Sequence, residues 1–174
     1  SKNSNEISNP FKRYQIGTVW RNEKSGPGRF REFTQIDADI VGSKNNLADA
    51  EMCSLISDTL IKCGLEKKDF VINLSNRKLI QGLINQLKIN SAKQKLTVIR
   101  AIDKLDRIGM SGVEQLLKKG RKDQSGDFTS GADLSDAQAS EVINFLKLKD
   151  ISDIKNILTD KLAIEGINEI QKIL

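Results

Sequence analysis

The sequence predicts an α+β protein, in which a partial antiparallel sheet is followed by an all-helical region. Aromatic and β-branched residues are concentrated in two early runs, residues 14–22 and 29–41, and a turn rich in Gly and Pro separates them. From about residue 91 this composition ends, and apolar residues recur every three or four positions, as on one face of a helix. Strands first and helices afterwards are typical of an α+β chain.

The two early runs are expected to form one long antiparallel hairpin, because turn residues join two strand-like segments. A helix is expected over residues 47–63. Either Asn45 or Asn46 is expected to cap its start, and Gly64 to end it. Residues 70–74 are expected to add a third strand.

The later elements are expected to be helices. Asn76 is expected to start a short one, and capping-box patterns, in which Glu or Gln follows a Ser by three positions, start two more at Ser111 and Ser135. Further amphipathic stretches begin near residues 91, 151 and 162. The polar, Gly-rich segment 120–133 is expected to be an exposed and mobile loop.

Three regions follow from this order of elements. Residues 1–86 are expected to form a partial sheet-containing domain, residues 87–158 a helical domain, and residues 159–174 a helix that leads back to the first domain. The last helix would leave an apolar face unpaired, so the chain is expected to be an internal piece of a longer protein.

The composition excludes several kinds of chemistry and favours others. The chain has no His, which excludes His-based acid–base catalysis and Ser-His triads, and no metal site is expected on this chain. Cys53 and Cys63 are expected to be buried free thiols within one helix. The chain has no apolar run long enough for a membrane span and no signal peptide at its start, so a cytoplasmic protein is expected.

The formal charge of +5 is concentrated at one end of the sequence. Residues 1–31 contain seven Lys or Arg against two Glu, whereas the remaining residues balance 21 against 21. A cationic cluster beside strand-like sequence suits a nucleotide phosphate or an RNA backbone, and solubility alone also explains a charge of this size.

One face of the second strand is dense in functional side chains. Alternation along the strand places six residues on that face: Arg29, Arg31, Phe33, Gln35, Asp37 and Asp39. Arg21 and Glu23 of the preceding strand are expected to meet them across the hairpin. Two cations, an acid and an aromatic ring suit a nucleotide site, although a half-exposed strand shows the same alternation without any function.

These residues carry a family resemblance. Arg21, Glu23 and the distant Phe33, placed around a turn, resemble motif 2 of the class II aminoacyl-tRNA synthetases. The longer pattern over residues 14–42, extended by 49–51, is similar to the histidyl-tRNA synthetase family in particular. The resemblance implies that the sheet is part of a class II catalytic core and that the helical region is the insertion domain of that family.

The resemblance implies a role in ATP binding for four residues. Arg21 would be catalytic, holding the α-phosphate of ATP and the carboxylate of histidine while charge builds up at phosphorus. Glu23 would bind the adenine amino group and Phe33 would stack on adenine. Arg29 would hold the distal phosphates, and Mg²⁺ would accompany the ATP.

The resemblance also implies an amino acid site. Gln35 and Asp39 would join Arg21 in binding L-histidine, through its amino group. Asp39 stands where many members have Glu, so its carboxylate reaches about one methylene less far. Arg31 is expected to form a structural ion pair with a neighbouring acid.

A contact with tRNA(His) is expected in the helical region. Its clear basic cluster consists of Lys118, Lys119, Arg121 and Lys122. These four residues suit an RNA backbone, and they equally suit a solvated helix end whose cations favour the helix dipole.

Three functions are compatible with this sequence. The first is part of a histidine–tRNA ligase whose complete form is a homodimer; motif 1, motif 3 and a second catalytic arginine are absent here, so the 174 residues alone are expected to be inactive. The second is the synthetase-like regulatory subunit of ATP phosphoribosyltransferase, which has no need of Arg21, Glu23, Arg29 and Phe33. The third is a plain RNA-binding domain.

Overall fold

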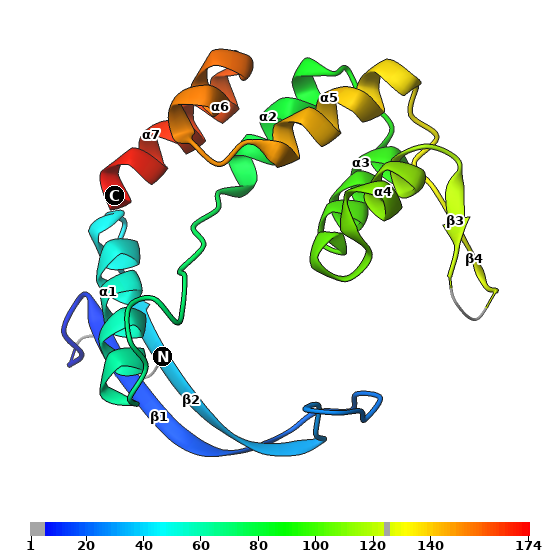
Figure 1. Ribbon diagram of the computed structural model, residues 1–174. Helices are drawn as coiled ribbons and strands as arrows, with labels where there is room; N and C mark the ends of the chain where they lie inside the picture. Colours follow the sequence, from blue (N-terminus) through cyan, green and yellow to red (C-terminus); the bar gives the residue numbers. More distant parts are fainter. Residues whose placement is uncertain (1–5, 124–125) are drawn as a thin grey trace. The chain divides into compact units, whose positions relative to one another are not determined.

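The computed structural model describes residues 6–123 and 126–174 of the chain (Figure 1). Within these ranges it holds seven helices and two small antiparallel sheets, which confirms the predicted α+β class. Contacts divide the chain into two compact units, Ser1–Val71 and Ile72–Leu174, which we call the hairpin unit and the helical unit. No helix in the described ranges is both long enough and apolar enough to cross a membrane.

The hairpin unit contains one long two-stranded sheet (Figure 1). Strand β1, Phe11–Trp20, pairs antiparallel with strand β2, Glu32–Val41, along the full length of both strands. A last backbone hydrogen bond of 2.8 Å joins the amide of Arg21 to the carbonyl of Arg31 beyond the strands. The turn is therefore longer than predicted, because Gly28, with a φ of 69°, reverses the chain in a tight turn of its own at the tip.

Helix α1, Leu47–Lys62, follows the hairpin. The side chain of Asn45 accepts a hydrogen bond from the amide of Leu47, and Gly64, at a φ of 96°, ends the helix, as predicted. Cys53 is half-buried and Cys63 is exposed, and both are free. The prediction of buried thiols is wrong, because no residue of α1 is buried.

The predicted third strand over residues 70–74 is not formed. A strand needs a neighbouring strand to pair its backbone groups. Within the described residues, β1 pairs only with β2 and no strand lies beside residues 70–74. The β-type composition of this segment is thus insufficient without a partner.

The helical unit contains the other six helices and a short hairpin. In chain order these are α2 (Arg77–Gln86), α3 (Ala92–Ile102), α4 (Leu105–Leu117), β3 (Gly120–Lys122), β4 (Phe128–Ser130), α5 (Asp136–Lys147), α6 (Ile151–Ile157) and α7 (Lys161–Ile173). The side chains of Asn76 and Ser91 cap α2 and α3, and Ser135 forms the predicted capping box with Gln138 at the start of α5.

Two predictions for the helical unit are wrong in detail. Ser111 does not cap a helix: Gly109, where φ is 67° and ψ is 176°, divides α4 into two helical segments, and the second segment begins directly after Gly109, ahead of Ser111. The segment 120–133 is more than a loop, since part of it pairs as β3 and β4. In this short hairpin Arg121 pairs with Thr129. Strands of three residues are too short to show a pattern of alternation in the sequence.

A single apolar core holds the helical unit together. Its largest fully buried side chains are Leu83, Ile84, Ile89, Leu117, Leu158 and Ile167. Helices α2 and α7 lie antiparallel at close range, because Gly82 leaves room for the backbone of Ala163. Beside this contact, Lys78 pairs with Glu165 and Glu169, each at 2.5 Å.

Candidate nucleotide-binding face of the hairpin

One face of the β1–β2 hairpin carries the predicted functional side chains. Strand β2 contributes Phe33, Gln35, Asp37 and Asp39, which alternate along the strand and are half-buried. Gly17 lies opposite Gln35 in the register and leaves space above the sheet, because a side chain there would meet nothing within 4 Å. The face therefore combines charged side chains with an open surface.

Arg21 is the centre of this face. It follows the last residue of β1, and its Nη2 donates a hydrogen bond of 2.9 Å to the side-chain oxygen of Gln35. Its guanidinium lies over the ring of Phe33, 5.2 Å from the ring centre, a cation–π contact. Its Nη1 is also 4.0 Å from the carboxylate of Glu23. A planar cation fixed from three sides is suited to a phosphate or a carboxylate.

The turn brings Glu23 and Arg29 together. Nε of Arg29 donates to the carboxylate of Glu23, and both side chains remain accessible to solvent. Arg31 donates from its Nε to the backbone carbonyl of Glu23 at 3.0 Å. The prediction of an ion pair between Arg31 and an acid is therefore wrong in its partner, because the wide turn presents a carbonyl there. The Arg31 side chain thus joins the two sides of the turn through this hydrogen bond.

Asp39 lies at the far end of the same face. It is four residues beyond Gln35, about 13 Å along the strand, and so does not contact Arg21. Nε of Arg13 bonds to Asp39 at 2.7 Å, and the Arg13 guanidinium is 3.7 Å from Asp37. The hydrogen bond with Asp39 raises the pKa of Arg13.

Sequence reasoning missed Arg13. The predicted strand began at residue 14, whereas the observed strand begins at Phe11 and places Arg13 directly opposite Asp39. Extending the apolar and polar alternation of β1 backwards from Gln15 would have found it. Arg13 holds the two carboxylates at this end of the face.

The four cations of the predicted basic cluster differ in their partners. Nζ of Lys118 lies 2.9 Å from Glu114 and 2.8 Å from Asp136, and the pKa of Lys118 is raised by these hydrogen bonds, chiefly the one to Asp136. Lys119 pairs with Asp133 at 2.6 Å. Arg121 and Lys122 lie on β3 instead. Two of the four cations are thus engaged by acids.

The described residues contain no cluster of three or more His, Cys, Asp or Glu side chains that could hold a metal ion. The acids of the candidate face are each engaged with arginine, Glu23 with Arg29 and Asp39 with Arg13. Cations and acids therefore lie side by side on this face and pair with one another.

An antiparallel hairpin with an arginine and an acid before its turn and an aromatic residue after it is the arrangement of motif 2, and it indicates a class II aminoacyl-tRNA synthetase. A profile of the family described as histidyl-tRNA synthetase matches residues 2–125. The chain belongs to the histidyl-tRNA synthetase family.

Curated relatives agree with this family. The histidine–tRNA ligase of Pelagibacter ubique (strain HTCC1062) is 54% identical, over 100% of this chain and 38% of that protein. The histidine–tRNA ligase of Rhizobium leguminosarum bv. trifolii (strain WSM2304) is 45% identical, over 98% of this chain and 35% of its own length. The histidine–tRNA ligase of Rhodopseudomonas palustris (strain TIE-1) is 48% identical, over 88% of this chain and 31% of its own length. The chain thus spans about a third of the length of these relatives.

Proposed function

We propose that this chain is the motif 2 and insertion part of a histidine–tRNA ligase, which activates L-histidine with ATP and transfers it to tRNA(His) in protein biosynthesis. The observation that carries the proposal is the set of contacts around Arg21, which joins Gln35, Phe33 and Glu23 on one face. In the proposed division of the chain, residues 1–86 belong to the catalytic core, 87–158 to the insertion domain, and 159–174 lead back to the core.

In the proposed activation step, a carboxylate oxygen of histidine attacks the α-phosphorus of ATP, a mixed anhydride forms, and pyrophosphate leaves. Arg21 offsets the negative charge that develops on the α-phosphate and orients the attacking carboxylate. Phe33 stacks on the adenine and Glu23 accepts a hydrogen bond from its amino group. Arg29 holds the distal phosphates, so its contact with Glu23 exchanges for ligand contacts on binding.

Gln35 and Asp39 are both proposed to bind histidine. Because about 13 Å of strand separates them, the amino group of histidine lies against Gln35, beside Arg21, and Asp39 binds the ligand further along the face. The ion pair between Arg13 and Asp39 directs that carboxylate along the face, where it can accept hydrogen bonds from an N–H group of the ligand. In the second step, a terminal ribose hydroxyl of tRNA(His) attacks the activated carbonyl and AMP leaves.

The remaining partners follow from this proposal. We propose that Mg²⁺ arrives bound to the ATP phosphates, since carboxylates and phosphates are the oxygen ligands that Mg²⁺ prefers. The complete protein is proposed to be a cytoplasmic homodimer. The 174 residues by themselves are proposed to lack ligase activity, because they span little more than a third of the relatives' length.

The test is histidine-dependent exchange of pyrophosphate into ATP, measured on the complete protein. Arg21→Gln is expected to lower the rate by about 10²- to 10³-fold, as expected for a donor that acts on developing charge. Lys24→Gln is the matched control, because Lys24 is an exposed cation of the same turn. Equal rates in the two variants would overturn the role of Arg21, and exchange by the isolated 174 residues would overturn their proposed inactivity.

Ligand binding separates the competing functions. A regulatory subunit of ATP phosphoribosyltransferase would bind histidine without ATP, and a plain RNA-binding domain would bind tRNA without either small molecule. Isothermal titration of the complete protein with ATP and with histidine is expected to give binding of both. Loss of ATP binding in Arg29→Gln, with histidine binding retained, would locate the phosphates at the turn.

A further inference from the structure

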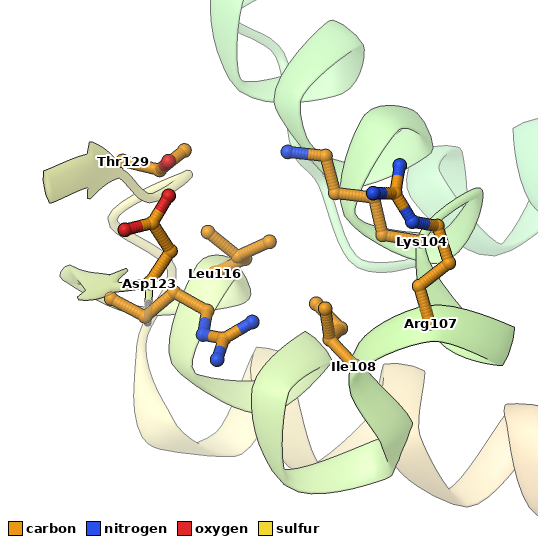
Figure 2. Close-up of a pocket in the computed structure, with 7 residues that line it drawn as sticks. Lys104, Arg107, Ile108, Leu116, Asp123 and Thr129 are labelled. Atoms are coloured by element: carbon orange, nitrogen blue, oxygen red, sulfur yellow. The ribbon is translucent and has the colours of Figure 1, made fainter. Parts of the chain in front are cut away.

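A pocket of about 670 Å³ lies in the helical unit, between the start of α4 and the β3–β4 hairpin. Its lining residues are Lys104, Arg107, Ile108, Leu116, Arg121, Asp123 and Thr129. Figure 2 shows Lys104 and Arg107 on one side and Asp123 and Thr129 on the other, with the apolar Ile108 and Leu116 between the two sides. All residues that line the pocket belong to the helical unit, and none of them belongs to the candidate face of the hairpin.

Cations outnumber acids around this pocket by three to one. In the described part of the chain, no hydrogen bond or ion pair links the side chain of Lys104 or Arg107 to another residue. Nε of Arg121 is buried and lacks a hydrogen-bond partner among the described residues. A buried donor left unsatisfied costs about 1–3 kcal/mol, which a bound anion would recover.

The backbone fixes the two walls of the pocket. Gly109 breaks α4 in a conformation that is essentially restricted to glycine, so the turn carrying Lys104 and Arg107 is set apart from the rest of the helix. Gly131 allows β4 to lie against the end of α4, since a Cβ there would stand 2.2 Å from the carbonyl of Lys118. The cations are therefore brought together by the fold.

The cations of the pocket differ from Lys118 and Lys119 in their partners. Those two lysines are engaged by Glu114, Asp136 and Asp133, whereas the cations of the pocket are not held by an acid ion pair among the described residues. Two guanidinium groups and an ammonium group around one pocket suit the three outer oxygens of a phosphate.

We propose that this pocket binds a phosphate group, held by Arg107, Arg121 and Lys104. The volume exceeds that of a bare phosphate, so an attached sugar also fits. Such a phosphate comes either from an RNA backbone or from free phosphate in solution. The proposal does not depend on the ligase activity proposed above, because no residue of the hairpin takes part in it.

The experiment uses the 174-residue chain with two probes, inorganic phosphate and a 12-base-pair RNA duplex of arbitrary sequence. Arg107→Gln and Arg121→Gln are each expected to weaken binding at least fivefold. Lys147→Gln is the matched control, because Lys147 is an exposed cation at the end of α5. For the duplex, each pocket variant is also expected to reduce the salt dependence of affinity by about one phosphate contact.

The two probes distinguish the source of the phosphate. Binding of the duplex that depends on Arg107 and Arg121 supports the RNA backbone, and equivalent binding of inorganic phosphate supports a free anion. Binding that is the same in the pocket variants and in Lys147→Gln, or no binding of either probe, overturns the proposal. Circular dichroism checks that each variant is folded, and the exposed Arg107 keeps the test valid if the half-buried Arg121 proves necessary for folding.

Discussion

The hairpin unit and the helical unit differ in what holds them together. The helical unit has a continuous apolar core, whereas no described residue of the hairpin unit is buried. On the hairpin, the side chains of Tyr14, Ile16, Trp20 and Ile36 are 79%, 63%, 71% and 65% exposed. The candidate catalytic side chains therefore lie on the part of the chain with the least apolar packing.

The geometry of the candidate site and the stability of the chain therefore have separate origins. The contacts around Arg21 and Glu23 are accessible hydrogen bonds and ion pairs, each of which contributes about 0–1 kcal/mol. Burial of a single Leu in the helical core contributes about 2 kcal/mol or more. The hairpin arranges functional groups, and the helices provide the folding free energy.

The largest expected difference between the two units is in the rate of amide hydrogen exchange. Amides in the middle of α2 and α7 are expected to exchange at least about a hundredfold more slowly than amides of β1 and β2, because opening the helices exposes the core. Exchange followed by mass spectrometry on the 174-residue chain measures both sets at once. Equal protection of the two sets would mean that the hairpin is as stable as the helices.

The next largest effect is expected from truncation of a core side chain. Leu83 is 1% exposed, so Leu83→Ala should lower the free energy of unfolding by about 2–5 kcal/mol. Ile36→Ala, a matched change on the hairpin, should alter it by less than about 0.5 kcal/mol, because that side chain is mostly in water. Urea unfolding followed by circular dichroism gives both values, and a similar loss in the two variants would contradict the comparison.

A pair of glycines tests packing in the two units. A Cβ at Gly82 would lie 2.5 Å from Cβ of Ala163 and 2.8 Å from its backbone nitrogen. Gly82→Ala is therefore expected to separate α2 from α7 and to cost about 1–3 kcal/mol. Gly17→Ala on β1 meets nothing within 4 Å and should be neutral in thermal unfolding. If Gly17→Ala were destabilised and Gly82→Ala were unaffected, close packing would lie in the hairpin unit and not in the helical unit.

The smallest effect is expected from the ion pairs of the helical unit in acid. Hydrogen bonds from Lys78 and then Asn76 lower the pKa of Glu169 below its ordinary value of about 4.5. Its contribution to stability is therefore present above that value and is lost as the pH falls through the lowered pKa of the folded state.

Glu169→Gln should accordingly be slightly less stable than the parent chain at pH 7 and equal to it once Glu169 is protonated in both states. Melting temperatures between pH 7 and pH 3 measure this. Glu141→Gln, a change at an exposed position of α5, is the control. A difference between Glu169→Gln and the parent chain that persists unchanged in acid would show that the ion pair is not responsible.

Much of the fold was predictable from local sequence. Caps such as Asn76 and Ser135 are local signals, because the side chain bonds to amides within the next turn of the same segment. Residues 70–74 were not predictable, because strand formation depends on a partner that composition does not reveal. The break at Gly109 lies two residues before the predicted helix start at Ser111, so the sequence located the second part of α4 and missed its first turn.

The sequence predicted which residues belong to the candidate site better than it predicted which of them contact one another. Alternation placed Phe33, Gln35 and Asp39 on one face, and the structure has them there. The partners of Arg29 and Arg31 depend on how the turn folds, and the pocket around Arg107 joins segments that have no pattern in common. Neither could be obtained from spacing along one element.

The antiparallel pairing of α2 and α7 has a consequence for how the chain can be rearranged. Asn76, where the chain enters α2, donates a hydrogen bond of 2.7 Å to Glu169 near the end of α7, so entry and exit lie at the same place. The segment between Asn76 and Glu169 therefore begins and ends at neighbouring points, as is common for inserted domains. Such a segment can be lengthened, shortened or exchanged as a cassette in a gene without redirecting the chain on either side of it.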